Sequence, residues 1–445
     1  MTPGEALDQG LALLRAEVRK AQDQAAKEVE ALQARVAVLE AEVAALSTAP
    51  NPAGDVGPAI TPAPSPSPVP IPAPIPAPIP APVPPPAPVP VHIVGAGILP
   101  DAAIPPGAVA DWLVRAGNPV AVPKTIVGMH FNRATNRPAY GYGLARTHDH
   151  DPAGDGSVGP QWRQIEPTQG DMHMDALRAF LATHERALWT FGATPAWAAS
   201  KPGVPSKWGP SGAGSNPRPI DALAPAVRAG VAAGAWAVEV WNEPEPHADY
   251  WSGGWYADTP EGLAELTRAQ YRAIAGVAPL IGPAFTDIGP GSAWKVDGYA
   301  NALGPGYLAG WSWHYYLSTP DPAKQAGELA STIRTMRAQV DATALTGLPL
   351  WLTEIGCEAW PAGVSAADQA VGVSRWLAVA AALGQQTCAL YAHDLPFAGS
   401  PATQPAVASA VGRAHALLAG NTIQQAAILT DGRVWIDTGA EAVTI

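Results

Sequence analysis

A proline-rich stretch divides this chain into parts that cannot share one fold. Nineteen of the 50 prolines lie between Pro50 and Pro90, and from Pro62 to Pro84 every second residue is proline. Proline has no backbone N–H to donate and restricts the residue before it, so this stretch cannot join a helix or a central strand. We expect residues 49–92 to form a polyproline II linker, at about 3 Å per residue.

Residues 1–48, before this linker, have the repeat of a coiled coil. Their apolar residues are separated by alternating steps of four and three, with one extra step of four that is expected to relax the supercoil. A helix with so narrow an apolar stripe needs partner chains, so we expect a homo-oligomer. We predict a trimer, with a dimer as the alternative, because Val and Leu at these positions do not decide between the two. The apolar positions are Leu7, Leu11, Leu14, Val18, Ala21, Ala25, Val29, Leu32, Val36, Leu39, Val43 and Leu46.

Charge and composition exclude several classes of protein. The chain has 26 Lys and Arg against 38 Asp and Glu, a formal net charge of −12, whereas binding to phosphates needs clustered basic residues. We therefore expect no nucleic-acid partner, and no membrane insertion because no run of about 18 apolar residues occurs. The first residues lack the basic and apolar regions of a Sec-type signal peptide. Two cysteines, Cys357 and Cys388, are too few for a disulfide framework, and we expect buried free thiols.

Residues 93–421 alternate between short apolar segments and helical patterns. Eight strands that alternate with helices predict a (β/α)8 barrel of the α/β class, and continuous apolar strands fit a parallel sheet covered on both faces. Residues 422–445 differ, because two short segments flank Asp431-Gly432, and they predict a β-hairpin appendage. The predicted strands are 125–131, 143–148, 187–191, 237–241, 280–285, 308–313, 348–353 and 387–391, and the predicted helices are 175–184, 222–233, 260–275, 322–342 and 366–383.

Two glutamates stand where a predicted strand meets a loop. The fourth strand runs into Asn242-Glu243-Pro244, and the seventh ends at Thr353-Glu354. In a (β/α)8 barrel the carboxyl ends of the strands carry the active residues. Two carboxylates facing each other there are the arrangement that glycoside hydrolysis needs, one to protonate the leaving oxygen and one to attack the sugar carbon. For either glutamate alone, a helix cap or an ion pair with an arginine is the alternative.

Together with other strand ends, these motifs resemble the clan of (β/α)8 retaining glycoside hydrolases that includes families 5 and 39. The resemblance covers most of residues 125–420, and the third strand, 188–198, is most similar to family 39. Asn-Glu-Pro is similar to the acid/base motif of the fourth strand, and Thr-Glu to the nucleophile of the seventh. His314-x-Tyr316 is similar to the His-x-Tyr of the sixth strand, and Arg146 to the arginine that approaches the nucleophile.

The resemblance implies a double-displacement mechanism. Glu354 would be the ionised nucleophile, its charge stabilised by Arg146 and by a hydrogen bond from Tyr316. Glu243 would be protonated at rest, because of the negative charge of Glu354 and partial burial, and would later act as a base. The carboxyl groups would then lie about 5 Å apart, and the configuration would be retained. The supporting roles of Asn242, at the sugar 2-hydroxyl, and of His314, beside Glu243 or the sugar, follow from the same resemblance.

Aromatic and polar residues near the strand ends are candidates for sugar contacts, because sugar rings lie flat on aromatic rings. The eighth strand ends Tyr391-Ala392-His393-Asp394, where many relatives have a tryptophan. A metal site in 148–151 is disfavoured, because adjacent residues of a strand point to opposite faces, so we expect no metal and no cofactor. The substrate-contact candidates are His130, His148, Trp197, Trp313, Trp360 and Tyr391; Trp251, Trp255, Glu245, Asp287 and Glu358 are weaker ones, and Glu166 is expected to be structural.

We therefore expect a retaining glycosidase that cleaves a polysaccharide or glycan. An oligomeric stem, a rigid spacer and the missing Sec signal resemble a phage tail fibre or tailspike that digests host surface polysaccharide, which would place the protein in the virion. Otherwise it would be a bacterial glycosidase, cytoplasmic or exported without a Sec signal. Two rival interpretations are a glycan-binding tail protein with weak or no catalysis and a structural fibre protein.

Overall fold

The computed structural model describes residues 109–131, 138–147, 161–206, 211–244, 256, 258–286, 297–360, 363–393, 399 and 401–445. The chain divides into two compact units, Met1–Pro78 and Ile79–Ile445, and every described residue belongs to the second. The predicted coiled coil of residues 1–48 and the proline-rich linker of residues 49–92 lie outside the described residues. Both stay predictions.

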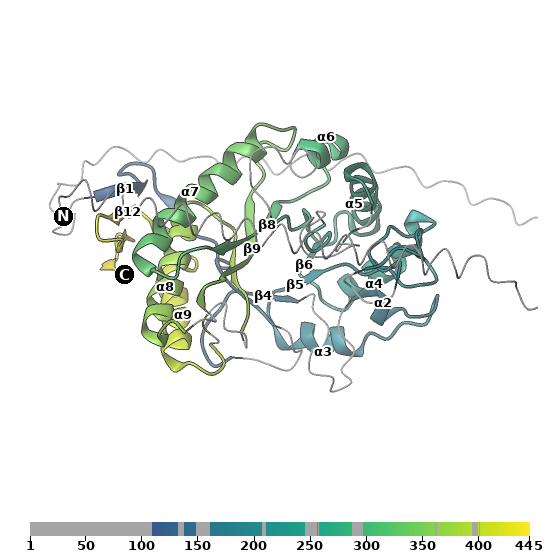
Figure 1. The fold of residues 1–445 in the computed structure, drawn as a ribbon, viewed down its shortest axis with the longest axis horizontal. Helices are drawn as coiled ribbons and strands as arrows, with labels where there is room; N and C mark the ends of the chain where they lie inside the picture. Colours follow the sequence, from purple (N-terminus) through teal and green to yellow (C-terminus); the bar gives the residue numbers. More distant parts are fainter. Residues whose placement is uncertain are drawn as a thin grey trace, which may run out of the picture. The chain divides into compact units, whose positions relative to one another are not determined.

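Eight parallel strands form a nearly closed barrel (Figure 1), which confirms the predicted (β/α)8 fold. The last strand pairs with the first, and isolated parallel bridges at Ile281–Gly310 and Phe285–Trp313 continue the circuit between the two edge strands, β7 and β8. The strands are β3 (Val127–His130), β4 (Leu144–Thr147), β5 (Ala187–Thr190), β6 (Ala237–Glu239), β7 (Leu280–Ile281), β8 (Trp311–Leu317), β9 (Leu350–Cys357) and β10 (Cys388–Leu390).

Helices lie around the strands in Figure 1, with α7, α8 and α9 on one side and α3, α4 and α5 on the other. Three of them begin where the sequence offers a cap: the side chains of Thr259, Asp321 and Ser365 each accept a backbone N–H of the first turn. The five predicted helices match α3, α4, α5, α7 and α8 within two residues at each end. The helices are α2 (Trp162–Ile165), α3 (Asp175–Thr183), α4 (Ala224–Ala232), α5 (Pro260–Ile274), α6 (Tyr299–Leu303), α7 (Pro322–Asp341), α8 (Ala366–Ala382) and α9 (Pro405–Leu418), with a 3-10 helix η2 (Ile220–Leu223).

Strand side chains alternate between the barrel interior and the helix layer, as the two-residue period of a strand requires. In β8, Ser312 hydrogen-bonds to Thr353 of β9 inside the barrel, at 2.7 Å. Its neighbour Trp311 instead stacks on Phe285, at 5.3 Å between ring centroids, and contacts Tyr299 of α6. This alternation decides which residues of each strand can reach a site in the barrel mouth.

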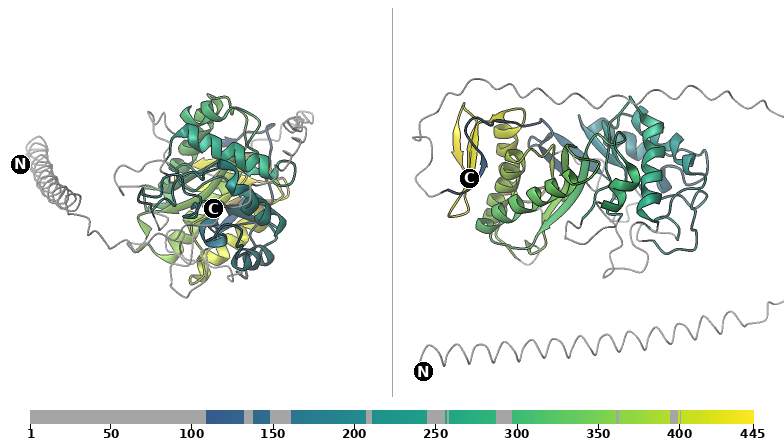
Figure 2. Two further views of the ribbon diagram at one scale, coloured as in Figure 1. Left: turned by 90° about the vertical axis from the view of Figure 1, so that its right-hand side faces the viewer. Right: turned by 90° about the horizontal axis from the view of Figure 1, so that it is seen from above.

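The C-terminal segment forms a larger sheet than the predicted hairpin. β12 (Gln425–Leu429) and β13 (Val434–Asp437) pair across the Asp431-Gly432 turn as expected, but β14 (Ala442–Thr444) and β1 (Val109–Val114) complete an antiparallel sheet in the order β1-β12-β13-β14. β2 (Val120–Ala121) pairs with β11 (Thr422–Ile423) in the same way. Figure 2 shows the yellow strands of this sheet to one side of the green helices. The prediction missed β1 because its partner lies more than 300 residues along the chain.

Within the described residues, no helix combines the length and the apolar character that crossing a bilayer requires. Both cysteines are buried and unpaired by disulfide, as expected.

Two glycines in helices test how tightly the helix layer packs on the barrel. A Cβ on Gly230 of α4 would lie 2.2 Å from a ring carbon of the fully buried Trp189, whereas a Cβ on Gly327 of α7 would meet nothing within 4 Å. We expect Gly230→Ala to destabilise the barrel by about 1–3 kcal/mol through overpacking. Thermal or urea unfolding followed by tryptophan fluorescence measures this, because all 16 tryptophans lie between Trp112 and Trp435.

Gly327→Ala is the matched control. Alanine loses less backbone entropy than glycine in a helix, so this variant should be stabilised by about 0.5–1 kcal/mol. Equal effects of the two substitutions would contradict the packing of α4 on Trp189.

Candidate active site

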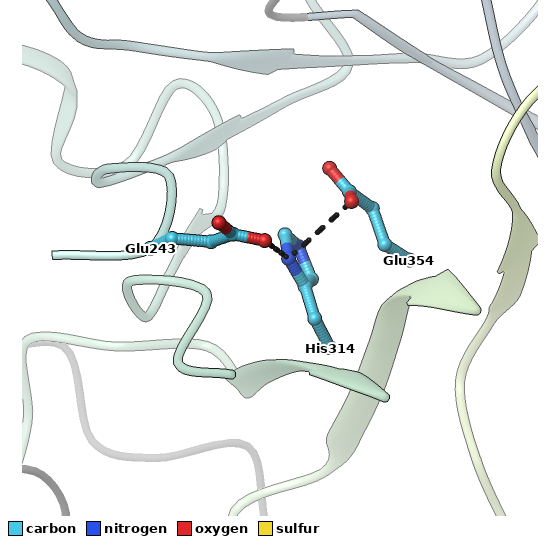
Figure 3. Close-up of side chains that lie close together, drawn as sticks. All are labelled: Glu243, His314 and Glu354. Carbon is cyan, nitrogen blue, oxygen red and sulfur yellow. Dashed lines mark hydrogen bonds and ion pairs between the residues drawn. The ribbon is translucent and has the colours of Figure 1, made fainter. Parts of the chain in front are cut away.

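Two glutamates and a histidine meet at the carboxyl end of the barrel (Figure 3). Glu354 comes from β9, His314 from β8 and Glu243 from the loop that follows β6. One side-chain oxygen of each glutamate and one nitrogen of the histidine all lie within 4.8 Å of one another. His314 Nδ1 lies 2.9 Å from Glu243 Oε1 and 3.5 Å from Glu354 Oε2. Carboxyl groups about 5 Å apart are the arrangement of a retaining glycosidase, and groups about 6.5–9.5 Å apart that of an inverting one.

Glu243 is held in an unusual backbone conformation. Its φ is 43°, in the left-handed region that residues other than glycine rarely adopt. The backbone N–H donates to Ala284 O at 2.9 Å, which ties the bend to the neighbouring segment. The side chain of Glu243 is 16% exposed, against 3% for Glu354. Strained residues of this kind concentrate at functional sites. Here the strained residue, Glu243, is the one whose carboxyl group is partly exposed, whereas that of Glu354 is buried.

Arg146, on β4, holds the base of the site together. Its Nη1 donates to Glu354 Oε1 at 2.5 Å, and its Nη2 donates to Glu239 Oε2 at 2.5 Å and to Asn242 Oδ1 at 2.8 Å. Arg146 is fully buried. Burial acts to lower the pKa of Arg146, but Glu239 and Glu354 outweigh it and raise this pKa, so the guanidinium stays charged. The predicted approach of Arg146 to Glu354 is therefore present.

Glu239 is a third buried carboxylate that the sequence interpretation left without a role. It accepts hydrogen bonds from Arg146, from Thr190 Oγ1 at 2.6 Å and from the hydroxyl of Ser312. Burial acts to raise the pKa of Glu239, but the charges of Arg146 and His314 and the two hydroxyl donors lower it overall. The sequence did offer a signal for Glu239: it is a carboxylate inside an apolar strand, where a buried charge is costly unless it is paired.

The hydroxyl of Tyr316 donates to Glu354 Oε2 at 3.1 Å, as predicted for the His-x-Tyr motif. Burial raises the pKa of Tyr316 well above its ordinary value, so the phenol keeps the proton that it donates. His314 takes the place beside Glu243 that we expected for it. The side-chain oxygen of Asn242 accepts a hydrogen bond from Arg146 Nη2.

Two candidates for sugar contacts lie beside this group. His130 Nδ1 is 3.4 Å from Arg146 Nη1, and its ring lies 4.8 Å from that of Tyr391. The Tyr391 ring in turn lies 6.2 Å from Tyr316. His148 lies outside the described residues, as do Trp251, Trp255, Glu245, Asp287 and Asp394.

Trp313 and Trp360 do not line the site, contrary to our expectation. Both are at most 1% exposed. Trp313 points from β8 into the helix layer, where its Nε1 donates to Gln385 Oε1 at 3.1 Å. Trp360 follows β9 and stacks on Trp376 of α8, with ring centroids 4.5 Å apart. A side chain enclosed in this way cannot offer a ring face to a sugar.

Trp197 is half-buried and has its own structural contacts. Its Nε1 donates to the backbone oxygen of Glu166 at 2.9 Å, and its ring meets Trp162 edge to face. The Glu166 side chain accepts from Trp162 Nε1 at 2.8 Å and from Gly170 N, in line with its expected structural role. The weaker candidate Glu358 is exposed just after β9.

Two carboxylates and an imidazole as close as Glu243, Glu354 and His314 are also a set that cations bind. In this site, however, the positive charge next to Glu354 is supplied by the guanidinium of Arg146, at 2.5 Å.

No known protein family matches the chain, and no curated protein matches it in sequence. Among solved structures, the chain is similar to a GH39 enzyme from Xanthomonas axonopodis pv. citri, with a TM-score of 0.51 and 19% identity over 78% of this chain and 77% of that one. A monomeric beta-xylosidase from Caulobacter crescentus gives a TM-score of 0.47 and 21% identity over 71% and 74% of the two chains. A GH30 endoxylanase from Clostridium papyrosolvens gives 0.42 and 13% over 73% and 76%. At 19% identity, the similarity to the Xanthomonas enzyme shows a shared fold.

Removal of the Arg146 guanidinium, which Glu239 and Glu354 share, should destabilise the barrel. Arg146→Gln leaves Glu239 and Glu354 without their partner, and a broken buried ion pair costs about 3–5 kcal/mol. Because the pKa of Glu239 in the folded protein is lowered, its stabilising contribution is present above its ordinary value of 4.5 and is lost as the pH falls through the folded value. The difference in unfolding free energy between wild type and variant should therefore be full at pH 7 and shrink below pH 4.5. Urea denaturation at several pH values measures it.

Arg334→Gln is the control, because Arg334 pairs with Asp111 on the surface, with side chains 44% and 39% exposed. An exposed pair contributes less than about 1 kcal/mol. A cost as small as this for Arg146→Gln would contradict the role of Arg146 as the charge that holds the site.

Proposed function

We propose that the barrel is a retaining glycoside hydrolase that cleaves a polysaccharide or glycan, with Glu354 as nucleophile and Glu243 as acid/base. The observation that carries the proposal is the pair of strand-end carboxylates with oxygens within 4.8 Å of each other. Their surroundings differ in the sense that the two roles require. Glu354 is buried against a cation, and Glu243 is the more exposed of the two.

In the first step, an oxygen of Glu354 attacks the anomeric carbon while Glu243 passes its proton to the leaving oxygen. Arg146 and Tyr316 hold the two oxygens of Glu354, at 2.5 and 3.1 Å, so the carboxylate is fixed before the substrate arrives. His314, 2.9 Å from Glu243, fixes the acid.

The second step reverses the proton transfer. Formation of the glycosyl-enzyme ester neutralises Glu354, and Glu243, now ionised, takes a proton from the water that attacks the anomeric carbon. His314 is the group beside Glu243 in both steps, because its Nδ1 lies between the two carboxylates (Figure 3). The two inversions together retain the configuration of the sugar.

The two carboxylates are expected to differ in what their loss does. Glu354→Gln should abolish turnover of every glycan and aryl glycoside, because no covalent intermediate forms. Glu243→Gln should lose about 10²–10⁴-fold on substrates with poor leaving groups, the range that general acid catalysis contributes, and much less on 2,4-dinitrophenyl glycosides. The measurement is kcat on a panel of aryl glycosides and polysaccharides, with NMR of the first-formed anomer to read the configuration.

Glu185→Gln is the matched control, since Glu185 lies on the surface just before β5, at the opposite end of the strands, with its side chain 78% exposed. It should hydrolyse like the wild type. Full hydrolysis by both active-site variants, or an inverted product, would refute the mechanism.

The proposal extends to the context of the enzyme, on the basis of the sequence of residues 1–92. A trimeric stem and a rigid proline-rich spacer suit a virion-borne depolymerase that acts on host surface polysaccharide. A mass of three chains in analytical ultracentrifugation, lost when residues 1–48 are deleted, is the expected result. A monomeric full-length chain would contradict the stem, and absence of the protein from purified virions would contradict the virion context.

A further inference from the structure

We propose that Glu239 is a positioning residue of the site: through Arg146 it sets how much positive charge reaches Glu354, and it does so without touching substrate. The contacts stand by themselves, and the catalytic consequence rests on the proposed hydrolase function.

The donors of Arg146 are directed at the side chains around it. A guanidinium has five N–H groups. Nε donates to Glu239, Nη2 to Glu239 and Asn242, and Nη1 to Glu354, and Nη1 also lies 3.4 Å from His130 Nδ1. Arg146 is fully buried as well, so it has nothing left for a ligand. Two carboxylates, Glu239 and Glu354, hold the Arg146 side chain in position and share its positive charge.

Glu239 is enclosed from all sides. Its side chain has no exposed surface. Oε2 accepts from Arg146 and from Thr190, and Oε1 accepts from Ser312. Neither oxygen is open toward the mouth of the barrel, so Glu239 can act on the reaction only through Arg146.

The groups that face Glu354 come from every neighbouring element. Arg146 lies on β4, His314 and Tyr316 on β8, and Glu243 after β6, with His130 and Tyr391 behind them at the ends of β3 and β10. Among the described residues of this set, Arg146 is the one group that is charged positively at every pH of interest.

Two carboxylates that share one cation each feel it less than one carboxylate would. With Glu239 ionised, two of the three hydrogen bonds that Arg146 donates to carboxylates go to Glu239, and one goes to Glu354. Arg146 therefore stabilises the ionised form of Glu354 less than it would if Glu239 were neutral. The cluster of Arg146, Glu239 and Glu354 also keeps a net negative charge.

A matched pair of variants separates charge from packing. Glu239→Gln removes the charge and keeps the shape, whereas Glu239→Asp keeps the charge and shortens the side chain. The full chain is labelled with 13C at the glutamate carboxyl carbons, and the signal of Glu354 is assigned from its loss in Glu354→Gln. NMR then follows its titration midpoint without any substrate.

In Glu239→Gln the midpoint of Glu354 should fall by about one unit or more, because Arg146 then acts on Glu354 alone. In Glu239→Asp it should stay within roughly 0.3 units of the wild type, since the charge is kept. Equal midpoints in all three proteins, with only a loss of thermal stability, would reduce Glu239 to a structural residue and overturn the proposal.

If Glu239→Gln does not fold, Thr190→Val carries the test. It removes one neutral donor at 2.6 Å from Glu239 and leaves all charges in place. Glu239 then draws more on Arg146, and the midpoint of Glu354 should rise by roughly a few tenths of a unit. A midpoint that is unchanged or falls would count against the proposal.

Hydrolysis provides a separate readout. On the best 2,4-dinitrophenyl glycoside of the panel, both limbs of the pH profile of kcat/KM should move to lower pH in Glu239→Gln and stay in place in Glu239→Asp. If the wild type cleaves no glycoside, the proposed function fails, while the titration still decides the role of Glu239.

Discussion

The buried guanidinium of Arg146 is the interaction on which the rest of the site depends. Three carboxylates, Glu239, Glu243 and Glu354, gather at one end of a barrel whose walls are apolar, and like charges at this distance repel strongly in a medium of low dielectric constant. Arg146 compensates two of them directly. Without it, the strands that bear these residues could converge only with their side chains protonated or turned away.

Rigid strands hold this charge pattern in place. Arg146, Glu239, His314, Tyr316 and Glu354 all lie on barrel strands, where parallel pairing fixes the distance between neighbours. Glu243 is the exception, because it follows the strand in a left-handed backbone conformation. Glu354 and its partners are therefore pre-organised, and the more exposed Glu243 lies on the bend.

Much of the fold and of the candidate site could be predicted from the pattern of the residues. Apolar strands alternating with helices indicated the barrel, and strand-end motifs named Glu243, Glu354, Arg146, His314 and Tyr316. Trp313 was misplaced because its neighbour His314 faces the site, so that residue 313 must face the helices. Trp360 lies in a loop, where no period exists, and its enclosure depends on Trp376 of a helix that follows.

Local sequence by itself determined the eight barrel strands, most helices, the Asp431-Gly432 hairpin and the acidic strand ends, because periodicity, caps and turn residues act over a few residues. The tertiary structure alone decided which distant parts of the chain come into contact. β1 joins a sheet whose other strands lie at the far end of the chain, and Glu239 meets Arg146 across the interior, 93 residues away in sequence. The first contact depends on two distant parts of the chain meeting, and the second on the order and stagger of all eight barrel strands. No short segment contains that information.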